Sequence, residues 1–178
     1  NSLPWLLQYM KGQGFYAEIV SDTEYRLVRE LGFPNSHMIY NGPIKDRKIF
    51  ETILSENGYI NLDSTEEPGW LEELSASYPQ RQFSVGLRVN CDIAALCPKE
   101  VLVEEEGGRF GYCYENGKLQ EVILRLSALP NVTVEGLHLH SSTQSRTVDV
   151  YAALASMAVR IAEEYNLTLS YVDMGGGY

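Results

Sequence analysis

The sequence has no apolar run long enough to cross a bilayer, which takes about 20 residues. Its first residues, Asn1–Trp5, lack a basic segment followed by an apolar one, so we expect no signal peptide. Positive charge is also scarce: 14 Lys and Arg residues stand against 24 Asp and Glu residues, and the formal net charge is −10. We therefore expect neither a membrane nor a nucleic acid as a partner, since phosphate backbones bind basic surfaces. A small anionic ligand is still compatible, because backbone amides and a few local charges can hold it.

Cysteine is rare too. The three cysteines, Cys91, Cys97 and Cys113, fit neither a zinc-ribbon nor a redox spacing, which indicates reduced thiols in a cytoplasmic protein. The rest of the composition is ordinary for a globular protein, with 44% hydrophobic and 21% charged residues. A length of 178 residues suits one domain or a large part of a bigger one.

Short apolar or β-branched runs alternate with helical patterns along the chain. The runs predict strands at Ala17–Ser21, Met38–Asn41, Tyr59–Asp63, Ser84–Asn90, Val132–His140 and Leu169–Met174. Helices are predicted at Asp22–Leu31, Asp46–Asn57, Glu66–Tyr78, Lys118–Leu129 and Thr147–Tyr165. Ser21 and Glu24 have the spacing of a capping box, and Gly32 stands where a helix end needs a left-handed residue. Residues 91–117 are predicted to be irregular.

This alternation predicts a parallel sheet covered by helices, and the strand faces favour a barrel. In Ser84–Asn90, Val85, Leu87 and Val89 share one face, while Gly86 and Arg88 lie on the other. In Val132–His140, one face carries Val134, Gly136, His138 and His140; in Tyr59–Asp63, it carries Tyr59, Asn61 and Asp63. A doubly wound sheet would have apolar strands throughout. Six strands are fewer than the eight of a (β/α)₈ barrel, so we expect part of one.

Two glycine and histidine segments could bind a ligand. Gly175–Gly177 follow a strand directly, which is typical either of a phosphate site built from backbone amides or of a flexible loop. His138 and His140 share a strand face. They could belong to a metal site, which would need more histidines than the chain has, could be satisfied inward side chains, or could include an imidazole stacked on a flat cofactor.

Two charged residues lie on the polar faces. Arg88 is mid-strand, so it must be paired if it is buried, either in a salt bridge inside the barrel or with a cofactor. Glu18 occupies a similar inward position on the first strand, unless it is an exposed carboxylate at the sheet edge.

Seven motifs stand out in chain order: Tyr16–Glu24, Ile39–Lys45 with Asn-Gly-Pro-x-Lys, Asn61–Ser64, Gly86–Asn90, Gly108–Gly111, Gly136–His140 and Asp173–Tyr178. Together they resemble the fold-type III pyridoxal-phosphate decarboxylases, the diaminopimelate, ornithine and arginine decarboxylase family. The resemblance implies a (β/α)₈ barrel of the alanine-racemase type, of which about strands two to seven are present. Residues 1–178 would form a partial cofactor-binding domain, with the family's C-terminal β-domain outside the chain and a homodimer in the full-length protein.

The resemblance also implies roles around a pyridoxal 5′-phosphate cofactor. His140 would stack on the pyridine ring, Glu18 would lie near its Schiff-base end, and Arg88 would support the ring from inside the barrel. Gly175, Gly176 and Gly177 would give backbone amides to the phosphate, and Thr143 would give its hydroxyl. No metal is expected.

The chain departs from the family pattern in two ways. The family has His-x-Gly-Ser where this chain has His140-Ser141-Ser142-Thr143, and the glycine replaced by Ser142 could alter the local turn. The family's cofactor-linked lysine would lie two residues before Asn1, and the acid that pairs with the pyridine nitrogen would lie beyond Tyr178. We therefore expect this segment by itself to be inactive.

The reaction implied is decarboxylation of a basic or diamino acid, with meso-diaminopimelate, which would yield lysine, as the first candidate substrate. Ornithine, arginine and carboxynorspermidine decarboxylases use the same barrel. Two alternatives are a catalytically inactive regulatory barrel of the decarboxylase type and an amino-acid racemase.

Overall fold

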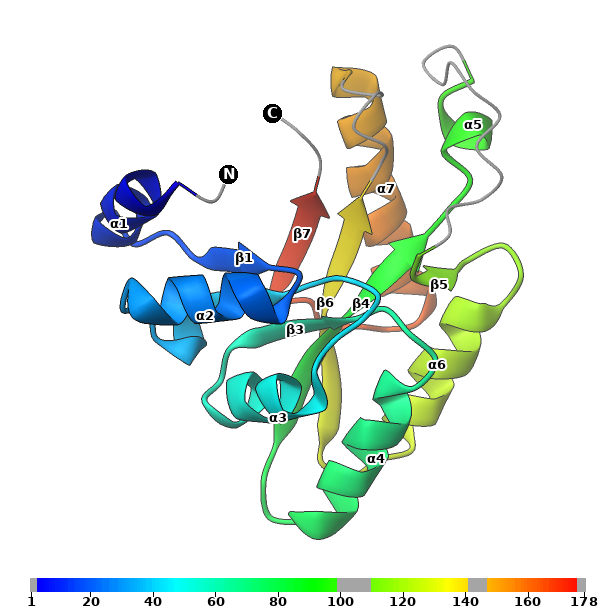
Figure 1. Cartoon of the computed structure of the whole chain (residues 1–178). Coiled ribbons are helices and arrows are strands. Elements are labelled where there is room, and N and C mark those ends of the chain that lie inside the picture. Colours follow the sequence, from blue (N-terminus) through cyan, green and yellow to red (C-terminus); the bar gives the residue numbers. More distant parts are fainter. Residues whose placement is uncertain (1–2, 99–109, 141–146, 176–178) are drawn as a thin grey trace.

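The computed structural model describes residues 3–98, 110–140 and 147–175 (Figure 1). Its strands are β1 (Ala17–Ile19), β2 (Met38–Tyr40), β3 (Tyr59–Leu62), β4 (Phe83–Asn90), β5 (Tyr112–Cys113), β6 (Val132–His140) and β7 (Tyr171–Gly175). Its helices are α1 (Pro4–Gly12), α2 (Asp22–Glu30), α3 (Arg47–Ser55), α4 (Glu67–Ser77), α5 (Ile93–Leu96), α6 (Lys118–Ser127) and α7 (Val148–Glu164), with a short 3₁₀ turn at Asn35–His37.

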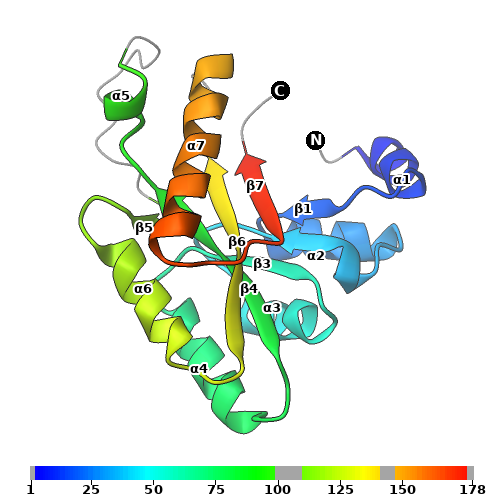
Figure 2. The same cartoon turned by 180° about the vertical axis from the view of Figure 1, so that it is seen from behind.

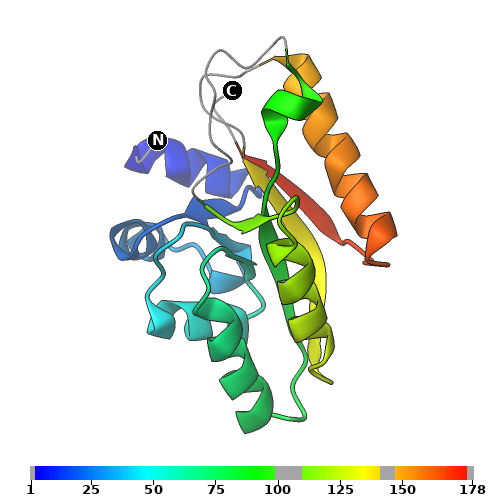
Figure 3. The ribbon, with the colours of Figure 1, turned by 90° about the vertical axis from the view of Figure 1, so that its right-hand side faces the viewer.

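The strands form one parallel sheet in the order β1-β2-β3-β4-β6-β7, and β5 pairs with the end of β4. The carboxyl ends of β4, β6 and β7 point to the same end of the molecule (Figures 1 and 2). The sheet is curled, with α4, α6 and α7 outside it (Figure 3). A parallel, curled sheet wrapped by helices confirms the prediction of an incomplete (β/α)₈ barrel.

The core lies between the sheet and these helices. Leu87 of β4 and Leu137 of β6 lie on the side of the sheet that faces the helices, and both are fully buried. Leu119 of α6 and Ile161 of α7 are fully buried too. Burial of each such side chain stabilises the fold by about 2 kcal/mol. The opposite face of the sheet is therefore free to carry polar residues.

The helix signals seen in the sequence are present. The Ser21 hydroxyl accepts the Glu24 backbone N–H, and the Glu24 carboxylate accepts the N–H of Val20, one residue earlier than in a standard capping box. Gly32 has a φ of +77°, the left-handed conformation expected after α2.

Three features differ from the sequence prediction. Helix α1 was not predicted; it buries no residue, and Leu7 packs against the core while remaining partly exposed. Helix α5 and strand β5 lie in the segment predicted to be irregular. Strand β6 contains a bulge: Val85 pairs with Val134 but Gly86 pairs with Gly136, so Glu135 is the extra residue. Placing Val134 on the polar face was therefore wrong, because the bulge shifts it into register with the outward-facing Val85.

Candidate active site

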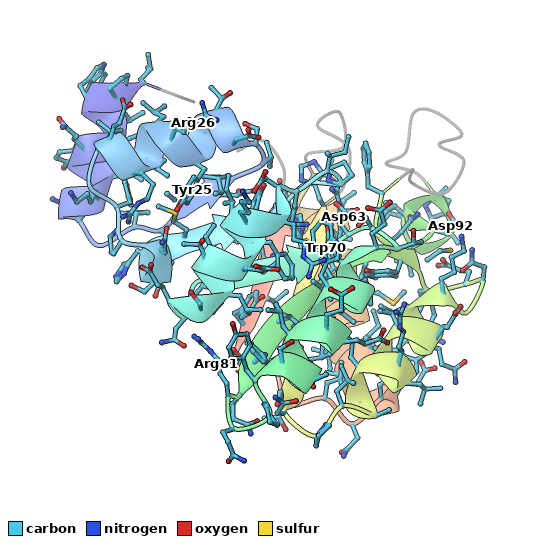
Figure 4. All side chains as sticks on the ribbon, turned by 60° about the horizontal axis from the view of Figure 1, so that its bottom comes forward. Tyr25, Arg26, Asp63, Trp70, Arg81 and Asp92 are labelled. Carbon is cyan, nitrogen blue, oxygen red and sulfur yellow. The ribbon has the colours of Figure 1, made fainter. Side chains whose placement is uncertain are left out.

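The strand register places polar residues in rows on the face turned away from the helices, since paired residues of neighbouring strands share a face. One row runs across four strands: Asn61, Gly86, Gly136 and Tyr171. The next row toward the carboxyl ends contains Arg88, His138 and Asp173, and the last contains His140 and Gly175. Asp63 and Asp92, which follow β3 and β4, lie at this end, whereas Arg81, which precedes β4, lies at the other (Figure 4).

The first row forms the floor of the site. A Cβ atom added at Gly86 or Gly136 would overlap the phenol of Tyr171, so the two glycines leave the space that this ring occupies. The Tyr171 hydroxyl donates to Asn61 Oδ1 at 2.8 Å, and the Tyr59 ring packs edge-on with centroids 4.7 Å apart. Burial, and then the nearby Asp173 carboxylate, raise the pKa of Tyr171, so the phenol stays protonated.

Two asparagines connect the floor to a pair of carboxylates. Asn61 Nδ2 donates to Asn41 Oδ1 at 2.8 Å and to Asp173 Oδ2 at 3.0 Å. Asn41 Nδ2 donates to the same Asp173 oxygen at 2.9 Å and to Glu18 Oε1 at 2.9 Å. Burial raises the pKa of Asp173, while the hydrogen bond from Asn41 opposes the shift. One amide group thus brings Glu18 of β1 near Asp173 of β7.

Arg88 is paired with Asp63 beside this network. Its Nη1 lies 2.8 Å from Asp63 Oδ2, and the Arg88 and Asp63 side chains are 13% and 1% exposed. The other Asp63 oxygen accepts the Gly111 N–H at 2.7 Å, and the Arg88 guanidinium lies 5.0 Å from the centre of the Phe110 ring. The salt bridge that was one of the two predicted alternatives for Arg88 is therefore present.

His138 and His140 stand next to Arg88, with their rings 6.1 Å apart. His138 is buried, and neither ring nitrogen has a hydrogen-bond partner in the part of the chain that the structure describes. Burial, followed by the positive charge of Arg88, lowers the pKa of His138 to about 4 and also lowers the pKa of His140. Both imidazoles are therefore neutral at pH 7.

Gly175 closes the row beside the two rings. A Cβ atom there would collide with Nδ1 of His140 and would lie 3.2 Å from Nε2 of His138. Any larger residue would push the imidazoles away, so glycine is required at this position by space.

The structure thus brings together four of the predicted residues, Glu18, Arg88, His140 and Gly175. Glu18 is exposed on the outer strand β1 and yet bonded to Asn41, so both descriptions considered for it hold in part. The predicted cofactor residues Thr143, Gly176 and Gly177 lie outside the described residues.

Sequence reasoning assigned no role to Asn41, Asn61, Asp63 or Asp173, although all four stand in the recognised motifs. The signal for Asn61 and Asp63 was their place on the polar face of a strand, two residues apart. Within the residues that the structure describes, no group of three or more metal-binding side chains is found. A search of the described helices likewise finds none that is long and apolar enough to span a membrane.

The chain is similar in sequence to known decarboxylases. The chain is 26% identical over 172 residues to the diaminopimelate decarboxylase of Actinosynnema pretiosum subsp. auranticum, covering 96% of this chain and 38% of that protein. It is 24% identical over 183 residues to the lysine/ornithine decarboxylase of Selenomonas ruminantium, covering 100% and 43%. The chain therefore spans less than half the length of these relatives.

A solved structure has the same fold. Diaminopimelate decarboxylase from M. jannaschii, determined with L-lysine, superposes with a TM-score of 0.82 at 21% identity, covering 99% of this chain and 42% of that one. The family profile described as "Pyridoxal-dependent decarboxylase, pyridoxal binding domain" matches residues 1–178. The chain belongs to this family of pyridoxal-dependent decarboxylases and matches their pyridoxal binding domain along its whole length.

Proposed function

We propose that the protein carrying this chain decarboxylates a basic or diamino acid with pyridoxal 5′-phosphate, and that meso-diaminopimelate, converted to lysine, is its substrate. The observation that carries the proposal is the convergence of His140, Arg88 and Asp173 at the carboxyl ends of neighbouring parallel strands, where barrel enzymes build their active sites.

The residues present fit the cofactor. Two neutral imidazoles packed against Gly175 suit contact with an aromatic ring, and the nitrogens of His138, which have no partner among the described residues, suit a polar group of a ligand. His140 would stack on the pyridine, while Thr143, Gly175, Gly176 and Gly177 would hold the phosphate. When bound, the cofactor supplies an electron sink for the pair left by the departing carboxylate.

The chain's own side chains would hold and orient the substrate. Glu18 is the exposed residue of β1, and one of its oxygens is bonded to Asn41; its carboxylate can accept hydrogen bonds from an ammonium group. Arg88 is anchored by Asp63 and cannot swing freely, so it would keep a fixed positive charge beside the ring. Its charge also disfavours protonation of His138 and His140, which keeps them neutral.

The substrate class rests on the relatives. They are named diaminopimelate or lysine/ornithine decarboxylases, and one similar structure holds L-lysine, so all concern amino acids with a second polar end. We further propose that residues 1–178 form one domain of a cytoplasmic protein that works as a homodimer. The three free cysteines accord with a reducing compartment.

The test compares the full-length protein with its His140→Ala variant. We expect pyridoxal 5′-phosphate affinity, followed by absorbance titration, to fall about tenfold because a ring contact is lost. Carbon dioxide release from diaminopimelate, ornithine, arginine and lysine should fall as well. His37→Ala is the matched control, since His37 is exposed and lies before β2, at the opposite end of the strands.

Two results would decide against the proposal. Unchanged titration and turnover in His140→Ala would reject the role of this residue. A parent protein that binds the cofactor but releases no carbon dioxide from any of the four amino acids would favour the regulatory barrel or the racemase.

A further inference from the structure

A second ion pair lies behind the site and is sealed from solvent. Lys45 Nζ is 3.1 Å and 3.2 Å from the two Glu67 carboxylate oxygens, and the side chains are 0% and 1% exposed. Lys45 also donates to the Gly42 carbonyl at 2.7 Å, so its ammonium is held between the loop after β2 and the start of α4.

The Glu67 carboxylate has a third partner. Its Oε2 accepts the backbone N–H of Asp63 at 2.8 Å. Asp63 stands where the chain leaves β3, and its side chain binds both Arg88 Nη1 and the Gly111 N–H. A continuous series of contacts therefore runs from Lys45 through Glu67 and Asp63 to the guanidinium in the site.

Stability alone does not account for this arrangement. Removing two charges from water carries a large desolvation penalty, and an apolar pair of similar volume is often as stable. Burial here lowers the pKa of Lys45 and raises that of Glu67, which reflects that penalty. What an apolar pair cannot do is accept the Asp63 N–H, and that acceptor fixes the residue on which Arg88 depends.

We infer that Glu67, held in place by Lys45, is a positioning residue for the reaction: it sets the backbone of Asp63 and through it the place of Arg88 beside the cofactor. Lys45 accordingly serves as the structural counter-ion of Glu67. The inference rests on the proposed function for its effect on catalysis, but its structural part stands on the contacts alone.

Two matched double variants separate positioning from packing. Lys45→Met with Glu67→Gln removes both charges and keeps an oxygen that can accept the Asp63 N–H. Lys45→Met with Glu67→Leu removes the same charges at similar volume and leaves that N–H without an acceptor. The control, Glu72→Gln with Arg125→Met, removes the exposed ion pair between α4 and α6, whose side chains are 38% and 41% exposed.

The first readout needs neither cofactor nor activity. Amide hydrogen exchange of the full-length apoprotein is followed at Asp63 and Gly111. We expect exchange at both amides to be about tenfold faster in the Leu variant than in the Gln variant, because an unpaired buried N–H no longer holds the segment. The control should exchange like the parent at both amides.

The second readout is the coupling to Arg88. Arg88→Met is added to the parent and to each double variant, and pyridoxal 5′-phosphate affinity and kcat are measured. The fold reduction in cofactor affinity caused by Arg88→Met should be the same in the parent and in the Gln variant, and so should the fold reduction in kcat. The reduction should be at least threefold smaller in the Leu variant, where Arg88 is already displaced.

Equal exchange rates in the two double variants, or an Arg88→Met effect of the same size in all backgrounds, would overturn the inference. If the parent neither binds the cofactor nor releases carbon dioxide, the proposed function fails. The exchange experiment then still decides whether Glu67 positions Asp63.

Discussion

Two neighbouring rows of residues on one face of the sheet differ in how their polar side chains are hydrogen bonded. The floor consists of Asn61, two glycines and Tyr171, and the Tyr171 hydroxyl and the Asn61 amide are both hydrogen bonded. The rim, one row toward the carboxyl ends, contains His138, whose two ring nitrogens have no partner among the described residues. In the rim row Arg88 and Asp173 also have partners, so among the described residues His138 is the member of that row whose polar atoms are left for a ligand.

The difference arises from side-chain size as much as from polarity. Gly86 and Gly136 leave room for the Tyr171 ring, which lies over both strands below the site. In the next row, Arg88 and His138 occupy the corresponding positions, and their charge and burial disfavour protonation of the imidazoles. Three substitutions, two in the rim and one in the floor, can test whether the two rows contribute differently to stability.

The largest effect is expected at the rim, from Arg88→Met. The Asp63 carboxylate, 1% exposed, would lose its cationic partner, and breaking a buried pair from one side costs about 3–5 kcal/mol. Chemical denaturation of the full-length protein measures this loss. Arg125→Met is the control, since its exposed pair with Glu72 contributes at most about 1 kcal/mol. Equal losses in the two variants would show that the Arg88 pair behaves like a surface pair.

The next effect is a pH dependence at His138. Its pKa is about 4 in the folded protein and 6.5 in the unfolded chain, so only the unfolded state takes up the proton between these values. Stability should therefore decrease as pH falls from 6.5 to 4, by about 3 kcal/mol from this residue. Arg88, Glu18, His140 and Asp63 all contribute to the field at this ring.

The measurement compares the free energy of unfolding at pH 7 and pH 4 for the parent and for His138→Gln. The variant should lose about 3 kcal/mol less on acidification, because it cannot be protonated. His37→Gln is the control, because His37 is exposed and lies before β2, away from the buried ring. If His138→Gln shows the parental loss, the buried imidazole is not the group that titrates.

The smallest of the three effects is expected at the floor, from Gly136→Ala. The added methyl would overlap the Tyr171 ring, and overpacking of this kind costs about 2 kcal/mol. The matched control is Gly12→Ala, because no atom lies within 4 Å of the added carbon there. In a Tyr171→Leu background the cost at Gly136 should fall below about 1 kcal/mol. An undiminished cost would mean that the ring is not what the glycine accommodates.

The sequence predicted the fold well because its signals are local. Alternation of polar and apolar residues predicted β6 with the observed bounds, and capping residues predicted α2 to within one residue. The same alternation also predicted which faces carry Arg88 and His138. It could not reveal the extra residue at Glu135, because an inserted residue looks like any other in a two-residue period.

The contacts that organise the site were not predictable in the same way. Lys45 and Glu67 are 22 residues apart, and their contact depends on how the loop after β2 meets the start of α4. Asn41 and Asp173 are 132 residues apart and meet only because the sheet curls. Such pairings depend on three-dimensional closure, about which local composition carries little information.

The enclosure of Lys45 has a practical consequence for chemical labelling. Amine-reactive aldehydes and esters modify lysines that they can reach, and the exposed Lys48 and Lys118 are open to them. The Lys45 amine, wholly covered and held by Glu67 and the Gly42 carbonyl, should stay unmodified until the protein unfolds. A label found on Lys45 by mass spectrometry would therefore report that this part of the protein has opened. A sample labelled on Lys48 and Lys118 but not on Lys45 would be one that is still folded.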